Sequence, residues 1–181
     1  MGCTRIAQEA QMSEQSSTTE SKQSRPALED QDSQDGKYLT FVIGEECYGL
    51  DISHVTEIIG MQKITSVPDV ENYVKGVINL RGKVIPVMDV RLRFGMSPRV
   101  YDDRTCIIVI NVGAHTIGLV VDTVSEVLDI GAGQIEDAAS VTGRQGNGFI
   151  KGLGKVNEDV KILLDAEKIL SDKDAAILAA A

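Results

Sequence analysis

The sequence contains few of the residues that build catalytic or metal sites. Its 181 residues include two histidines, three cysteines and no tryptophan. Cys3, Cys47 and Cys106 lie far apart and form no C-x-x-C pair, which argues against a disulfide framework and a cysteine zinc site. We interpret the latter two as small core residues in a reducing cytoplasm. His54 and His115 have no nucleophile or second histidine nearby in sequence, a pattern typical of surface histidines.

Phosphate-binding glycine motifs are absent as well. After Gly131–Gly133, a dinucleotide-binding fingerprint would need its third glycine at the position that Glu136 occupies. The segment Gly152–Lys155 continues with Val156 rather than with the serine or threonine of a P-loop. We therefore expect no enzymatic activity, no cofactor and no metal ion.

Aromatic residues and positive charge are also scarce. Aromatic residues make up 4% of the sequence, and 18 Lys and Arg face 27 Asp and Glu, for a net charge of −9. Nucleic-acid binding needs positive surface and stacking platforms, so the alternative of a nucleic-acid-binding module is disfavoured. No apolar run is long enough to cross a bilayer, and no signal region is recognisable, so we expect a cytoplasmic protein without membrane insertion.

Composition divides the chain into a folded part and two tails. Residues 1–36 are rich in Ser, Gln, Thr and Glu and hold hardly any apolar side chains, which predicts a disordered N-terminal tail. Regular patterns begin near Lys37 and continue to residue 170. An alanine-rich C-terminal tail follows at residues 171–181.

An internal repeat organises the folded part. Residues 73–94 align without a gap on residues 149–170, and we refer to these as the first and second copies. The matched pairs are Tyr73 with Phe149, Gly76 with Gly152, Val84 with Val160, and Asp89 with Asp165. The extended segment 125–130 likewise echoes residues 56–59.

The first copy predicts a β-hairpin followed by a short helix. Its strands are expected at Val77–Leu80 and Val84–Met88, with Gly82 supplying the positive φ of a tight turn. Pro86 has no N–H for a ladder, which predicts an edge strand or a bulge at that point. Asp89 is expected to cap the helix.

The repeat predicts a mainly β fold. Each half should supply about five short strands, with a joint between the halves near residues 97–104. Asp51 and Asp122 are expected to cap minimal helical turns where the halves match. We predict two five-stranded SH3-like β-barrels packed on a shared aliphatic core, with short helices and a C-terminal helix. Because aromatics are few, Val, Ile and Leu are expected to carry that packing.

Four motifs resemble those of one protein family. The segments are NLRGKVIPVMDVR at Asn79–Arg91, VTEII at Val55–Ile59, GLVVDTVSEVL at Gly118–Leu128 and FIKGLG at Phe149–Gly154. Together they are similar to the CheW family of chemotaxis coupling proteins, over residues 37–170. The resemblance implies two SH3-like barrels and a non-enzymatic adaptor. It would join the cytoplasmic tip of methyl-accepting chemoreceptors to the regulatory domain of the chemotaxis histidine kinase, in arrays at the inner membrane.

The same resemblance implies which residues bind the receptor. Matched position by position, these are Val55, Glu57, Arg81, Val127 and Gly152, while the kinase-binding surface stays unassigned. For Arg81 two interpretations remain open, an interface anchor or a charge kept at a turn tip for solubility. The alternative function is a CheW-like module of another chemotaxis adaptor or kinase-regulatory assembly.

Overall fold

The structure, a computed structural model, describes residues 34–142 and 148–170. Both predicted tails therefore lie almost entirely outside the described residues. The strands are β1 (Lys37–Ile43), β2 (Glu46–Asp51), β3 (Val55–Gly60), β4 (Val74–Leu80), β5 (Lys83–Asp89), β6 (Cys106–Val112), β7 (His115–Val121), β8 (Thr123–Asp129), β9 (Ile135–Asp137), β10 (Ile150–Val156) and β11 (Asp159–Leu164). The helices are α1 (Val90–Arg93), α2 (Ala138–Thr142) and α3 (Ala166–Ile169), with short 3₁₀ turns η1 (Ile52–His54) and η2 (Ala132–Gln134).

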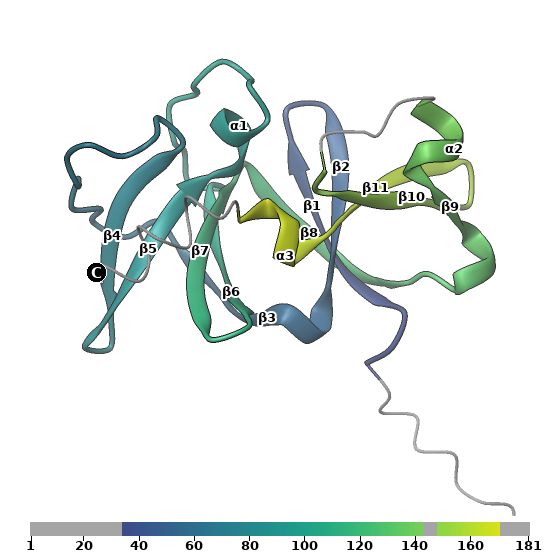
Figure 1. Cartoon of the computed structure of the whole chain (residues 1–181), viewed down its shortest axis with the longest axis horizontal. Coiled ribbons are helices and arrows are strands. Elements are labelled where there is room, and N and C mark those ends of the chain that lie inside the picture. The colour runs from purple at the N-terminus through teal and green to yellow at the C-terminus, as the bar shows by residue number, and fades with distance from the viewer. Residues whose placement is uncertain (1–33, 143–147, 171–181) are drawn as a thin grey trace, which may run out of the picture. The chain divides into compact units, whose positions relative to one another are not determined.

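The strands form two sheets. One has six strands in the order β8-β1-β2-β11-β10-β9, and the other has five in the order β3-β6-β7-β5-β4. The predicted mainly β fold with short helices is confirmed, although one sheet has six strands where five were expected. Figure 1 shows β1 and β2 beside β8 and β11, and β6 and β7 in the other sheet.

The two halves of the sequence exchange hairpins, so the prediction that each half builds its own barrel is wrong. The β1–β2 hairpin joins β8–β11 of the second half through the parallel pairing of β2 with β11. The β6–β7 hairpin joins β3–β5 of the first half through β5 and β7. The predicted joint near residues 97–104 therefore does not separate the sheets, and the chain crosses between them at β2–β3 and β7–β8. Local patterns specify hairpins, whereas the choice between two similar partner hairpins depends on long-range contacts.

Three clusters of buried side chains form the core. Alternation along the strands divides them, since Ile108 and Ile110 of β6 enter one cluster while Ile107 and Val109 enter another. The largest, which we call the shared cluster, takes residues from both sheets and from α1 and α3, which confirms a core common to both. Its buried members are Leu39, Phe41, Ile43, Tyr48, Leu50, Met88, Val90, Ile108, Ile110, Val112, Ile117, Leu119, Val121, Leu164, Ala166 and Ile169.

The shared cluster is not purely aliphatic, which corrects the prediction from composition. Phe41 and Tyr48 belong to it, and Tyr73, Phe94 and Phe149 pack against it. The ring centroids follow one another at 6.0 Å (Phe41 to Tyr48), 5.1 Å (Tyr48 to Phe94) and 4.8 Å (Phe94 to Phe149). The few aromatic side chains are thus concentrated where the two sheets meet, because large rings bury the most apolar area there.

The two copies of the repeat have the same backbone structure. The backbone N–H of Asp89 donates to the carbonyl of Tyr73 at 2.7 Å, and the N–H of Asp165 donates to the carbonyl of Phe149 at 2.8 Å. The register shifts once in each hairpin, between residues 74 and 76 and between residues 150 and 152. The carboxylates of Asp89 and Asp165 cap α1 and α3 as predicted.

Two local predictions require correction. The carboxylate of Asp51 caps η1 as expected, but no helix follows Asp122. Asp122 instead accepts hydrogen bonds from the backbone N–H of Gly44 at 2.8 Å and from Arg91 Nη1 at 2.6 Å. β5 as a whole is not an edge strand, since it lies between β4 and β7, and no bulge occurs at Pro86; its pairing with β7 begins at Val87, so Pro86 itself has a paired strand on one side only.

Candidate functional site

The predicted site residues Val55, Glu57 and Val127 lie on two edge strands that connect the sheets. After β2 and η1 the chain passes from the six-stranded sheet to the five-stranded sheet, where β3 is an edge strand. After β7 it returns to the six-stranded sheet, where β8 is an edge strand. Opposed residues of an antiparallel pair point to the same face of a sheet. The strand register therefore shows which face each site residue occupies.

One group of residues faces the core that the sheets share. Val127 is opposite Leu39, and Val55 is opposite Ile110, and both partners belong to the shared cluster. Val55 is half-buried and packs against that cluster, while Val127 is 48% exposed. These residues lie on the core-facing side of their strands but at its edge, where Val127 is open to a partner.

Ile58 belongs to the same group, although the prediction from the sequence did not include it. Ile58 is opposite Ile108 of the shared cluster and is 44% exposed. Its position in VTEII matches that of Val127 in VSEVL, so the internal alignment contained the signal. We call Val55, Ile58 and Val127 the inter-sheet rim. Ile58 and Val127 are thus exposed aliphatic side chains at equivalent positions on two edge strands, which makes each a candidate for an apolar contact with a partner.

Glu57 and Arg81 form a separate arrangement on the opposite face of β3. Glu57 is opposite Val109, whose side chain belongs to the core of the five-stranded sheet. Arg81 Nη1 and Nη2 donate to the two carboxylate oxygens of Glu57, each at 2.9 Å. The pair borders a hollow of about 300 Å³ that is also lined by Leu80, Ile85 and Val109. The structure thus pairs two predicted site residues and separates them from the inter-sheet rim.

The backbone conformation at Arg81 is one that the turn could form more readily with another residue. Arg81 has φ 51° and Gly82 has φ 84°, as in the two-residue turns that join twisted strands. Positive φ is uncommon for arginine and is tolerated best by glycine and asparagine. The equivalent residue of the second copy is Asn157, with φ 56°. Hydrogen bonding to Glu57 and its negative charge raise the pKa of the Arg81 guanidinium.

Gly152 lies apart from both groups. It is buried on β10, and a Cβ atom at this position would come within 2.7 Å of the Glu136 carbonyl oxygen of β9. Gly76, its equivalent, has φ 135° and an added Cβ would collide with the Thr65 carbonyl. Both glycines allow a neighbouring segment to pack closely against the hairpin, so Gly152 acts through packing and presents no side chain to a partner.

The described residues contain no group of three or more His, Cys, Asp or Glu side chains placed to hold a metal ion. Within the same part of the chain, no helix has the length and apolar character required to cross a membrane. The side chains that stand out are apolar at the inter-sheet rim and charged at the Glu57–Arg81 pair.

Comparison with known proteins identifies relatives of similar length. Residues 37–174 match the model of the CheW-like domain family. The chemotaxis protein CheW of Klebsiella aerogenes is 39% identical over 142 residues, which cover 78% of this chain and 86% of that protein. CheW of Thermotoga maritima is 35% identical over 136 residues, 74% of this chain and 87% of the relative. The crystal structure of the scaffolding protein TtCheW from Thermoanaerobacter tengcongensis has a TM-score of 0.70 and 34% identity, and covers 77% of this chain and 94% of that chain.

Proposed function

Because this chain belongs to the CheW family of chemotaxis proteins, we propose that it is a non-enzymatic adaptor that couples chemoreceptors to the chemotaxis histidine kinase. Family membership rests on the domain match and on the identity to named CheW proteins. The similar crystal structure is that of a scaffolding protein, which supports the same kind of role. An adaptor works through two contact surfaces held on one rigid body, and a core shared between two sheets supplies that rigidity.

The inter-sheet rim is the observation that carries this proposal. Ile58 and Val127 are both large aliphatic side chains, 44% and 48% exposed, at equivalent positions on edge strands of different sheets. An amphipathic helix binds by laying its apolar face against such a surface. The helical tip of a chemoreceptor is therefore the partner that we assign to the rim, with Val55 supporting the rim from within.

Glu57 and Arg81 lie on the other face of β3, but β3 is an edge strand, so we assign them to the same partner as a charged group across that edge from Ile58. Charged groups around an apolar contact contribute orientation and association rate more than affinity. The ion pair is bidentate, and Arg81 is 74% exposed, so its guanidinium can also meet an acidic partner group. The kinase's regulatory domain is the second partner, which would recruit this cytoplasmic protein to receptor arrays at the membrane.

The proposal is tested by receptor-dependent kinase activation in a reconstituted mixture of receptor, kinase and this protein. Val127→Asp and Ile58→Asp place a charge within the apolar contact and should each reduce activation about tenfold or more. Val100→Asp is the matched control, since Val100 is 88% exposed and lies outside the rim. Equal activation by all three variants would show that the inter-sheet rim does not bind the receptor. Failure of the unmodified protein to bind the kinase's regulatory domain on size exclusion would contradict the adaptor function.

A further inference from the structure

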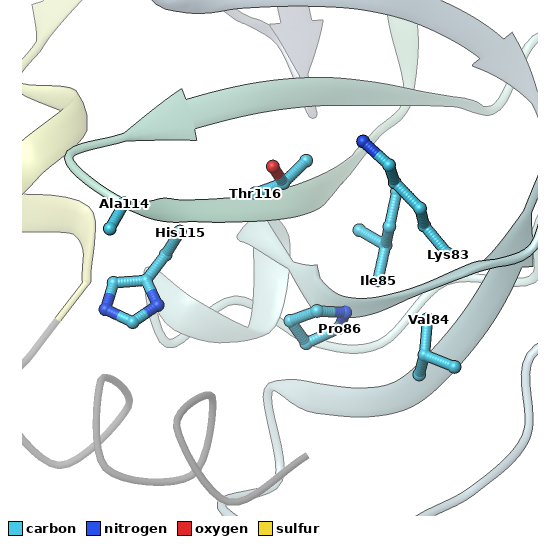
Figure 2. Close-up of a pocket in the computed structure, with 7 residues that line it drawn as sticks. All are labelled: Lys83, Val84, Ile85, Pro86, Ala114, His115 and Thr116. Carbon is cyan, nitrogen blue, oxygen red and sulfur yellow. The ribbon is translucent and has the colours of Figure 1, made fainter.

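β5 and β7 are paired over only part of their length. Their parallel register covers Val87–Asp89 and Gly118–Val120. Before this ladder, Lys83–Pro86 and Ala114–Thr116 border a hollow of about 420 Å³. Figure 2 shows the seven side chains, which come from two facing segments of these strands. We call this unpaired part of the β5–β7 boundary the seam.

Proline accounts for the place where the ladder stops. Pro86 has no N–H, so β5 cannot extend its pairing with β7 past this residue. In the second copy the equivalent residue is Ile162, which pairs with Tyr48, and the β11–β2 ladder begins one position earlier. The part of β5 that precedes its parallel ladder is therefore one residue longer than the corresponding part of β11.

Backbone groups are directed into the seam. The two-residue turns that join β4 to β5 and β6 to β7 are closed by the pairs Leu80–Lys83 and Val112–His115. Residues alternate in the direction of their amide and carbonyl groups along a strand. Those of Val84 and Thr116 consequently point across the seam, and within the described residues no strand pairs with them there. Such groups favour the addition of an extended peptide.

The charged side chain that lines the seam among the described residues is the cation Lys83, whereas the protein as a whole is acidic. Lys83 and His115 line the 420 Å³ hollow, and no acidic residue of the described part of the chain does. Among the described residues that line the adjoining 300 Å³ hollow, the only acidic one is Glu57, whose carboxylate is already bonded to Arg81. The net charge of the chain is −9. A local cationic border on an acidic protein selects a ligand with negative charge.

We propose that the seam between Lys83–Pro86 and Ala114–Thr116 is a binding site for a short, extended, acidic peptide segment of a partner protein. The segment would lie along the seam and exchange hydrogen bonds with the backbone of Val84 and Thr116. Its carboxylates would pair with the ammonium group of Lys83. This surface goes beyond the adaptor function, because it needs neither the inter-sheet rim nor the receptor.

The first test is a fluorescence anisotropy titration with a labelled peptide of alternating valine and glutamate. The peptide should bind the full chain, and the same sequence with lysine in place of glutamate should not. Lys83→Asp introduces the residue found at the equivalent position of the second copy, Asp159, and should weaken binding about fivefold. Pro86→Ile, matched on Ile162, should weaken binding by closing the seam while leaving the circular dichroism spectrum unchanged. Equal binding of both peptides, or unchanged binding by both variants, would overturn the proposal.

The second test follows amide hydrogen exchange at Val84 and Thr116 in the unmodified protein. Both amides should exchange fast without peptide and slowly when the acidic peptide is saturating. Slow exchange in the peptide-free monomer would assign the seam to another segment of the same chain. Protection that rises with protein concentration would assign it to a second copy. Either result would overturn the proposal.

Discussion

The two copies of the repeat share a backbone but differ in chemistry. Each consists of a hairpin with one register shift, a hydrogen bond from the capping aspartate to the preceding aromatic residue, and a four-residue helix. In the first copy the turn bears Arg81, which binds Glu57, whereas the second has Asn157. Asp89 is 4% exposed and accepts a hydrogen bond from the Tyr101 hydroxyl at 2.8 Å. The two copies thus share one backbone structure, and the side chains that differ between them give the first copy its charged turn.

Removal of the capping carboxylate should give the largest difference in stability between changes made in the first copy and in the second. Asp89→Ala leaves both the Leu92 N–H and the half-buried Tyr101 hydroxyl without this acceptor, and should lower the free energy of unfolding by about 3 kcal/mol. Asp165→Ala removes a partly exposed cap and should cost about 1 kcal/mol. Urea unfolding of both variants measures the difference. Equal losses would mean that the burial of Asp89 contributes nothing.

The two crossings between the sheets offer a second contrast. Asp51 caps η1 at the first crossing. At the second crossing Asp122 accepts hydrogen bonds from the Gly44 N–H and from Arg91. The Asp122 side chain is 13% exposed and the Arg91 side chain is 20% exposed. Asp122→Ala should therefore cost about 2 kcal/mol of unfolding free energy, and Asp51→Ala about 1 kcal/mol. The same urea titration ranks them, and a smaller loss for Asp122→Ala would contradict the importance of this contact.

The contact between Tyr101 and Asp89 of the first copy should make the free energy of unfolding depend on alkaline pH. Burial, together with the hydrogen bond to Asp89 and the charge of Asp89, raises the pKa of Tyr101 above its ordinary value of 10.0. The folded protein therefore holds this proton where the unfolded chain loses it. The stabilisation is complete below pH 10 and declines as pH rises further. Tyr101→Phe should cost about 1 kcal/mol at neutral pH and reduce that alkaline decline. Thermal unfolding between pH 7 and pH 11 measures both effects, and Tyr48, whose pKa is also raised by burial, accounts for a remaining slope.

Exchange of the turn residue should have the smallest effect on stability and still alter function. Arg81→Asn introduces the residue of the second copy, which adopts positive φ more readily, so the melting temperature should stay within about 2 °C of the unmodified protein. Receptor-dependent kinase activation should nevertheless fall, because Glu57 loses its partner. Normal activation by Arg81→Asn would favour the other interpretation of Arg81, a charge kept at the turn for solubility.

Much of the local structure could be predicted from the sequence. The repeat, the hairpins, and the capping roles of Asp51, Asp89 and Asp165 follow from short-range patterns, and the structure confirms them. The family assignment followed from four motifs. The prediction that Asp122 caps a helical turn was wrong. An aspartate before a strand has the same short sequence pattern as one before a helical turn. The two cases are distinguished by the contact of Asp122 with Arg91, which is distant in the sequence.

Residue types and spacing determined by themselves which segments form strands, where hairpins turn and that the chain is built from two copies. Tertiary structure alone decided that the halves exchange hairpins and that the rings gather between the sheets. It also placed Glu57 against Arg81 while Ile58 turned to the opposite face. The physical reason is that the alternation of side chains along a strand defines its two faces but does not determine what each face contacts. Which face becomes core, rim or seam is settled by pairings between residues far apart in the chain.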